Sequence, residues 1–123
     1  MRIISAAKTV AGTMLIAASM GAAHCQTYPS KPIHIIAPGP GGIDVAVRLI
    51  TPALGSALGQ AVVVENRPAG VLLGQTAARA QPDGYTLLFT GGSHWLAPLL
   101  QKDVPYDPIK DFAPISLIYT VPY

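Results

Sequence analysis

The stretch IIAPGPGGIDVAVR, residues 35–48, joins two kinds of secondary structure through a short loop of glycine and proline. The apolar run at 33–37 predicts a buried strand. Apolar residues that recur at helical spacing from 45 to 58 predict a helix, which we expect to end at Gly59. A loop that opens straight into a helix leaves the first backbone N–H groups of that helix without partners. The stretch therefore predicts a strand–loop–helix unit with donor groups at its turn.

Pro52 lies inside this predicted helix. Proline has no N–H and crowds the carbonyl of the residue four positions earlier, which here is Arg48. In a helix interior this costs about 3 kcal/mol before repacking. We therefore expect a kink at Pro52.

The same unit recurs along the chain. Further strands are predicted at 61–65 and 85–90, and short helices at 72–80 and 94–100. A proline-rich connector at 104–114 precedes one more predicted strand at 115–121. Alternating strands and helices predict an α/β fold, in which a parallel sheet carries helices on its faces.

The first 25 residues differ in composition from the rest. They combine a basic start, an apolar run at 10–20 and small residues after it, which is typical of a secretory signal peptide cleaved after Ala23 or Cys25. A buried amphipathic helix is the alternative interpretation of the same pattern. Cys25 is the only cysteine, so an internal disulfide is excluded, and export without a disulfide favours a bacterial periplasm.

Removal of the leader changes the charge of the chain. The full sequence has a formal net charge of +2, but six basic and six acidic residues remain after residue 25, and their charges cancel. This balance predicts no basic patch for nucleic acid or an anionic membrane. His34 and His94 have no partner at metal-ligand spacing, and no complete nucleotide-binding motif occurs, so we expect neither a metal nor a cofactor.

The loops after the three predicted strands all contain glycine. The carboxyl ends of parallel strands gather along one edge of a sheet, and each of these loops opens into a helix. Three helix N-termini at one edge present free N–H groups and positive dipole ends, which suit a small carboxylate without any cationic side chain. Ordinary tight turns explain the same glycines equally well.

Several side chains beside these loops have more than one interpretation. Asp44 lies in the first turn of a predicted helix, where a carboxylate favours the helix dipole over a ligand contact. Arg67 has three candidate partners, namely Asp44, Glu65 and a ligand acid. Ser93 and His94 suggest a nucleophile and its base, but no nucleophile elbow surrounds them, so His94 is better interpreted as a loop donor or a helix-capping neighbour.

Four segments in order resemble one known family. They are YPSKPIHIIAP (28–38), VVVENRPAG (62–70), PDGYTLL (82–88) and VPYDPIKDFAPISLI (104–118). These segments are similar to the Bug receptors, the periplasmic solute-binding receptors of tripartite tricarboxylate transporters, and the likeness covers 28–123. The resemblance implies a two-lobed Venus-flytrap fold of the periplasmic-binding-protein type. It also implies a receptor, not an enzyme, that binds a small carboxylate or related metabolite and delivers it to a membrane permease.

The resemblance also implies a ligand site. Its residues would be Gly41, Gly42, Asp44, Ala69, Gly70, Ser93 and His94. The chain departs from the family pattern at Gly39, where an aromatic is usual, and at Ile43, where a threonine hydroxyl is usual. Val71 replaces a glycine, and Trp95 replaces a small residue and is expected to fill part of the cleft.

Members of this family extend well beyond Tyr123, so we expect an incomplete first lobe. Residues 26–103 would form the N-terminal part of lobe 1, and residues 104–123 a crossover segment toward a missing lobe 2. We expect such a fragment to be poorly soluble and to bind ligand weakly or not at all, because a sheet edge and an apolar face would be exposed. The alternatives are an exported α/β hydrolase-like enzyme remnant and a nonfunctional truncated receptor.

Overall fold

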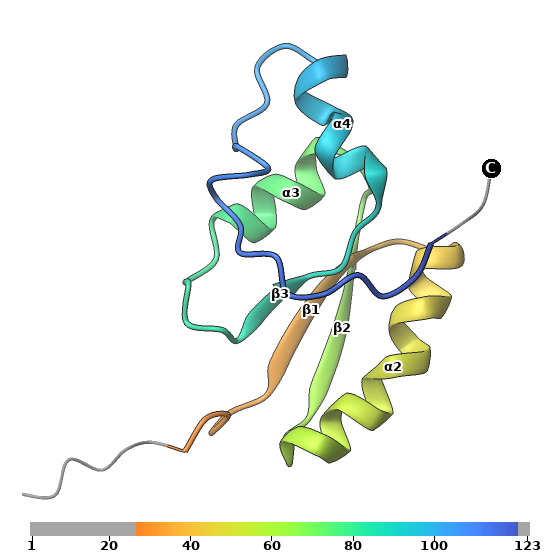
Figure 1. Ribbon diagram of the computed structural model, residues 1–123, viewed down its shortest axis with the longest axis vertical. Coiled ribbons are helices and arrows are strands. Elements are labelled where there is room, and N and C mark those ends of the chain that lie inside the picture. The colour runs from red at the N-terminus through yellow and green to blue at the C-terminus, as the bar shows by residue number, and fades with distance from the viewer. Residues whose placement is uncertain (1–26, 121–123) are drawn as a thin grey trace, which may run out of the picture.

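A computed structural model describes residues 27–120, and Figure 1 shows three strand–helix units followed by an irregular connector. The elements are β1 (Ile33–Pro38), α2 (Gly42–Leu58), β2 (Val62–Arg67), α3 (Val71–Ala78), β3 (Thr86–Leu88) and α4 (Gly92–Leu100). The predicted signal peptide at 1–25 lies outside the described residues. Among the described residues, no helix is both long and apolar enough to cross a membrane.

The three strands form one parallel sheet in the order β2-β1-β3. Ile33 pairs with Val62 at the start of β1, and Pro38 pairs with Arg67 at its end. On the other side of β1, His34 lies opposite Thr86. Because the strands run in the same direction, their carboxyl ends lie together, toward the top of Figure 1. The predicted parallel α/β sheet is confirmed.

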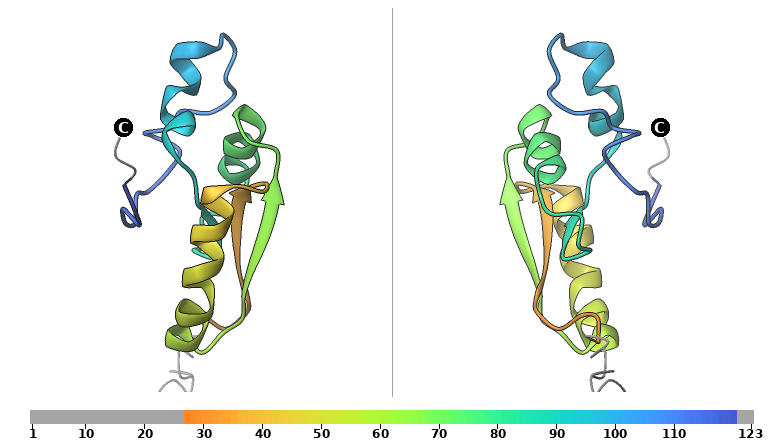
Figure 2. Two further views of the ribbon diagram at one scale, coloured as in Figure 1. Left: turned by 90° about the vertical axis from the view of Figure 1, so that its right-hand side faces the viewer. Right: turned by 90° about the vertical axis from the view of Figure 1, so that its left-hand side faces the viewer.

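Helices α2 and α3 lie on opposite sides of this sheet (Figures 1 and 2). Helix α2 packs on β1 and β2, whereas α3 packs on β1 and β3. Right-handed crossovers require this arrangement, because the chain moves from β1 to one neighbour and then crosses back to the other side of β1. The strand order therefore reverses at β1, between the loop after β1 and the loop after β3.

The core lies between α2 and the sheet. Ile35 and Ala37 of β1 are buried against Val47 of α2, with exposed fractions of 2%, 0% and 0%. Partly buried apolar residues surround them, namely Leu54, Val62, Val64, Leu87 and Phe89. Side chains alternate along a strand, so His34 faces the other side of the sheet.

Helix α2 ends as predicted. Gly59 has a φ of 66°, and its N–H donates to the carbonyl of Gly55. The helix continues through Pro52 as one element, because a single missing hydrogen bond does not end a 17-residue helix that packs on the sheet. The kink at Pro52 stays a prediction. Helix α4 likewise continues through Pro98.

The predicted strand at 115–121 is wrong for the residues that the structure describes, because 115–120 are irregular. No hydrogen bond between backbone groups involves 115–120 in the described part of the chain. Ile115 and Leu117 are largely exposed, and the ring of Tyr119 stacks on Phe89 with 6.4 Å between centroids. The apolar pattern is typical of a strand, but a strand also needs a neighbour that offers N–H and C=O groups in register.

The connector after α4 is held by aromatic packing. The ring of Tyr106 lies parallel to that of His94 with 5.1 Å between centroids, and Phe112 meets His94 edge-on at 4.7 Å. Tyr106 also covers Gly74 of α3 so closely that a Cβ atom at Gly74 would lie 2.4 Å from the ring. The connector therefore docks on α3 at a position where any side chain larger than that of glycine would overlap the ring of Tyr106.

We predict that the effect of Gly74→Ala on the free energy of unfolding changes sign with residue 106. In the wild-type background the added methyl overlaps the ring of Tyr106, and overpacking of this kind costs about 1–3 kcal/mol. In a Tyr106→Ala background the overlap is gone, and alanine should stabilise the helix by about 1 kcal/mol over glycine. Urea unfolding of the four chains measures both effects. Destabilisation of equal size in the two backgrounds would contradict the packing described here.

Candidate functional site

Three helices begin at the edge of the sheet where the strands end (Figure 2). The first backbone N–H groups to reach a carbonyl are those of Val45 in α2, Leu73 in α3 and His94 in α4. Several N–H groups before them have no hydrogen bond within residues 27–120, namely those of Gly42, Ile43, Asp44, Val71, Leu72, Gly92 and Ser93. Each helix start therefore offers free donors and the positive end of a helix dipole.

Direct contacts tie the loops at this edge together. The N–H of Gly39 donates to the carbonyl of Arg67 at 3.1 Å, which extends the pairing of β1 and β2 into the first loop. A Cβ atom at Gly91 would lie 3.2 Å from Cδ1 of Ile43, so the third loop lies against the first turn of α2. Helices α3 and α4 also contact each other. The starts of the three helices thus share one edge of the molecule.

Gly70 turns the chain between β2 and α3. Its φ of 100° lies in a region that L side chains rarely adopt, and no atom lies within 4 Å of where its Cβ would be. The backbone conformation, not the space, therefore requires glycine at this position. Ala69 is exposed beside it. The Cβ positions of Gly42 and Gly92 are open as well, so a ligand has room to approach these amides.

The Asp44 carboxylate makes no capping bond to the start of α2. Both of its oxygens accept hydrogen bonds from Nε of Arg48 at 3.1 Å, and Oδ1 also accepts one from Nδ2 of Asn66 at 2.7 Å. These bonds, from Arg48 first and Asn66 second, hold the pKa of Asp44 below its ordinary value. Asp44 is thus ionised and already paired.

Arg67 pairs with Glu65 and not with Asp44. Its Nη2 lies 3.4 Å from Oε2 of Glu65, while Nδ1–H of His34 donates to Oε1 of the same carboxylate at 2.6 Å. The hydrogen bond from His34, followed by the contact with Arg67, lowers the pKa of Glu65. These side chains lie on the face of the sheet that carries α3. The guanidinium of Arg67 is therefore part of a surface network with Glu65 and His34.

Ser93 and His94 are adjacent in sequence but differ in environment. Ser93 is exposed at the start of α4, whereas His94 is only 5% exposed and packs among the rings of Tyr106, Phe112 and Trp95. Nδ1 of His94 has no hydrogen-bond partner in the described residues. No hydrogen bond joins Ser93 to His94 in that part of the chain, so the two lack the geometry of a nucleophile and its base.

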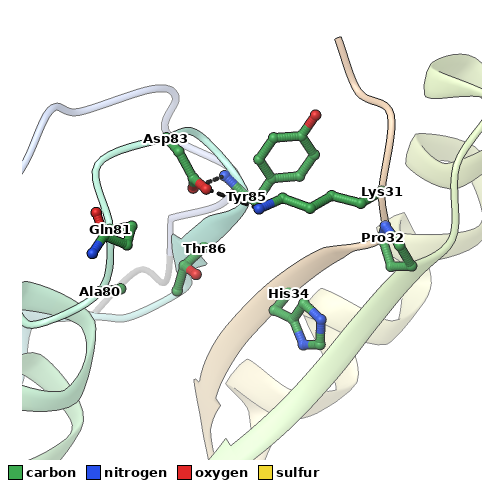
Figure 3. Close-up of a pocket in the computed structure, with 8 residues that line it drawn as sticks. All are labelled: Lys31, Pro32, His34, Ala80, Gln81, Asp83, Tyr85 and Thr86. Carbon is green, nitrogen blue, oxygen red and sulfur yellow. Dashed lines mark hydrogen bonds and ion pairs between the residues drawn. The ribbon is translucent and has the colours of Figure 1, made fainter. Parts of the chain in front are cut away.

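The hollows in the surface lie elsewhere. Figure 3 shows one of about 350 Å³ at the opposite edge, where β1 and β3 begin. Lys31 spans it, with Nζ 3.0 Å from Oδ2 of Asp83 and 4.3 Å from the centre of the Tyr85 ring (Figure 3). A second hollow of about 440 Å³ lies between α4 and the connector, where Trp95 and Ile109 contribute to its walls. Neither hollow includes Gly42, Gly70 or Ser93.

Two side chains at the candidate edge were not predicted as site residues. Arg48 and Asn66 contact Asp44 from α2 and from the end of β2. The spacing of Asp44 and Arg48, four residues apart in a predicted helix, is a signal that could have identified the first contact. Nothing local in the sequence identifies Asn66, because it reaches Asp44 across 22 positions. In residues 27–120 no group of three acidic, histidine or cysteine side chains could hold a metal ion.

Comparison with known proteins gives a consistent result. Residues 46–123 match the model of the tripartite tricarboxylate transporter family receptor. A UPF0065 protein of Bordetella bronchiseptica is 47% identical over 114 residues, which are 89% of this chain and 34% of that protein. The chain therefore spans about a third of the length of this curated relative.

Solved structures agree in sequence and in fold. The periplasmic binding protein BugD is 35% identical with a TM-score of 0.66, over 72% of this chain and 31% of that one. MatC from Rhodopseudomonas palustris, solved with bound malate, is 34% identical with a TM-score of 0.66, over 74% and 33%. The expected fold, an incomplete first lobe of a periplasmic-binding-protein-like structure, is confirmed by these matches.

We predict that the stability of the chain falls as the pH drops below about 6.5, because of His94. Burial lowers the pKa of His94, so the unfolded chain takes up a proton near pH 6.5 while the folded chain resists it. The stability is complete above about pH 6.5 and falls by at most about 1.4 kcal/mol per unit as the pH drops toward the folded pKa. Urea midpoints of the wild-type and His94→Gln chains at several pH values measure this. Equal pH slopes in the two chains would exclude this role of His94.

Proposed function

Because the chain belongs to the tripartite tricarboxylate transporter receptor family, we propose that it carries the first-lobe part of a solute receptor that binds a small carboxylate. The ligand would be passed to a membrane permease, and the receptor would act in the periplasm. The names of the relatives support this proposal, since BugD is a periplasmic binding protein and MatC was solved with malate.

One observation carries the choice of ligand class, namely the free N–H groups of three helix starts at one edge of the sheet. Backbone donors at helix N-termini favour an anion without needing a cation beside it. Arg48 and Arg67 are paired with acidic groups, so neither supplies an unpaired charge at this edge. A small carboxylate has the charge and the acceptor oxygens that such donors satisfy.

The residues in the proposed site take different roles. The amides that follow Gly41 and Gly70, together with the exposed hydroxyl of Ser93, are the groups proposed to contact the ligand. Asp44 and His94 would act indirectly, because one is paired and the other is buried. The burial of His94 also supports a receptor over a hydrolase remnant that would use Ser93.

We predict that malate shifts the NMR signals of the amides at Gly42, Val71 and Ser93 in a ¹⁵N-labelled chain. The expected dissociation constant is on the order of 1 mM, because one lobe surrounds only part of a ligand. Malamide, which has the same shape without the charges, should leave these signals in place. The amide of Gly84, at the opposite edge, serves as the internal control.

The Ser93→Ala chain should bind malate about two- to tenfold more weakly, the size of one lost hydrogen bond. Ser116→Ala, in the irregular exposed segment, is the matched control and should bind as the wild type does. Equal responses to malate and malamide, or shifts confined to the edge of Gly84, would overturn the proposed carboxylate site.

A further inference from the structure

We propose that Arg48 and Asn66 are positioning residues that hold the first loop in place and draw the Asp44 carboxylate away from the free amides of α2. The amides would then remain open to an outside anion. The part of this inference that concerns an anion rests on the proposed function. The part that concerns the loop stands on geometry alone.

Asn66 is the centre of the arrangement. Its Nδ2 donates to the carbonyl of Pro38 at 3.0 Å and to Oδ1 of Asp44 at 2.7 Å, and its Oδ1 accepts a hydrogen bond from Nη2 of Arg48 at 2.7 Å. The reverse orientation of the amide would place its NH₂ group against the guanidinium, so the network fixes which way Asn66 points. One side chain at the end of β2 therefore joins the first loop to the first turn of α2.

Arg48 determines the direction in which the Asp44 carboxylate points. Its Nε lies 3.1 Å from both carboxylate oxygens, and the Asp44 side chain is only 18% exposed. A carboxylate in the first turn of a helix is normally attracted to the free N–H groups and the dipole there. The N-cap residue, Gly41, has no side chain, and the Asp44 carboxylate bonds Arg48 and Asn66 while the N–H groups of the first turn are unoccupied within residues 27–120. The contacts with Arg48 and Asn66 account for this.

The charge balance at the edge follows from the same contacts. An unpaired Asp44 would repel a carboxylate ligand and would itself compete for the amides of Gly42 and Ile43. Paired with Arg48, it adds no net charge to the edge. The Lys31–Asp83 pair at the opposite edge has a similar separation, 3.0 Å, and shares no partner with this network. It provides a matched control.

The first experiment needs no ligand. In the Asn66→Ala chain, amide hydrogen exchange should be faster at Gly39 and Val45, whose N–H groups are bonded to the carbonyls of Arg67 and Gly41 on either side of the first loop. The NMR-detected pKa of Asp44 should rise toward its ordinary value. Asn66 is exposed, so the chain should keep its fold, which circular dichroism checks. Unchanged exchange and an unchanged pKa in a folded variant would overturn the positioning role.

The second experiment separates charge from structure by means of a double-mutant cycle with malate. Arg48→Gln should weaken binding roughly fivefold and Asp44→Asn should strengthen it by a similar factor, the size of one unit-charge interaction near water. The Asp44→Asn/Arg48→Gln chain should return close to the wild-type affinity. A purely structural role would instead weaken binding in all three chains. Lys31→Gln and Asp83→Asn should leave binding unchanged.

The two experiments fail in different ways. If malate binds none of these chains while Asn66→Ala still loosens the loop, the proposed carboxylate function is overturned and the positioning role stands. If malate binds all of them equally well, the carboxylate function stands. The proposal that Arg48 keeps the Asp44 carboxylate away from the amides of α2 is then overturned.

Discussion

The pairing of β1 with strands on both sides is the constraint on which the rest of the structure depends. β1 is the only described strand with two neighbours, and both run parallel to it. That pairing brings three carboxyl ends to one edge, buries Ile35 and Ala37, and places α2 and α3 on opposite faces. The reversal of strand order at β1 is the kind of point where open α/β sheets hold their ligands. The strand order of the sheet therefore determines where the candidate site lies, and the side chains only modify it.

The electrostatic field at this edge depends on which side-chain charges are neutralised by partners within the chain. Arg48 pairs with Asp44, and Arg67 pairs with Glu65, so these charges neutralise each other. The electrostatic field that remains comes from the backbone at the three helix starts. Such a field attracts anions in general and selects weakly among them. Selection would depend on the side chains around the amides, such as those of Ile43 and Trp95.

The sequence was sufficient for the local units and insufficient for contacts across the fold. Periodicity and glycine placed β1, α2 and the stop at Gly59, because these depend on neighbours in the chain. The failure of the predicted strand over 115–120 arose because pairing depends on a distant partner, which an apolar pattern does not reveal. The burial of His94 was missed for the same reason: its surroundings come from the connector, around Tyr106 and Phe112. Arg67 has three candidate partners in the sequence, and its pairing with Glu65 depends on the geometry of the folded chain.

The alternation along β1 has a consequence for how the chain reaches this state. A slip of one residue between β1 and its neighbours would exchange the two faces of the strand. The imidazole of His34 would then enter the apolar layer under α2 and lose its bond to Glu65, while Ile35 would turn outward. A shifted register is therefore less stable for two reasons: the imidazole would be buried without its hydrogen-bond partner, and Ile35 would lose its apolar contacts. The position of His34 in the central strand therefore disfavours a shifted register between β1 and its neighbours.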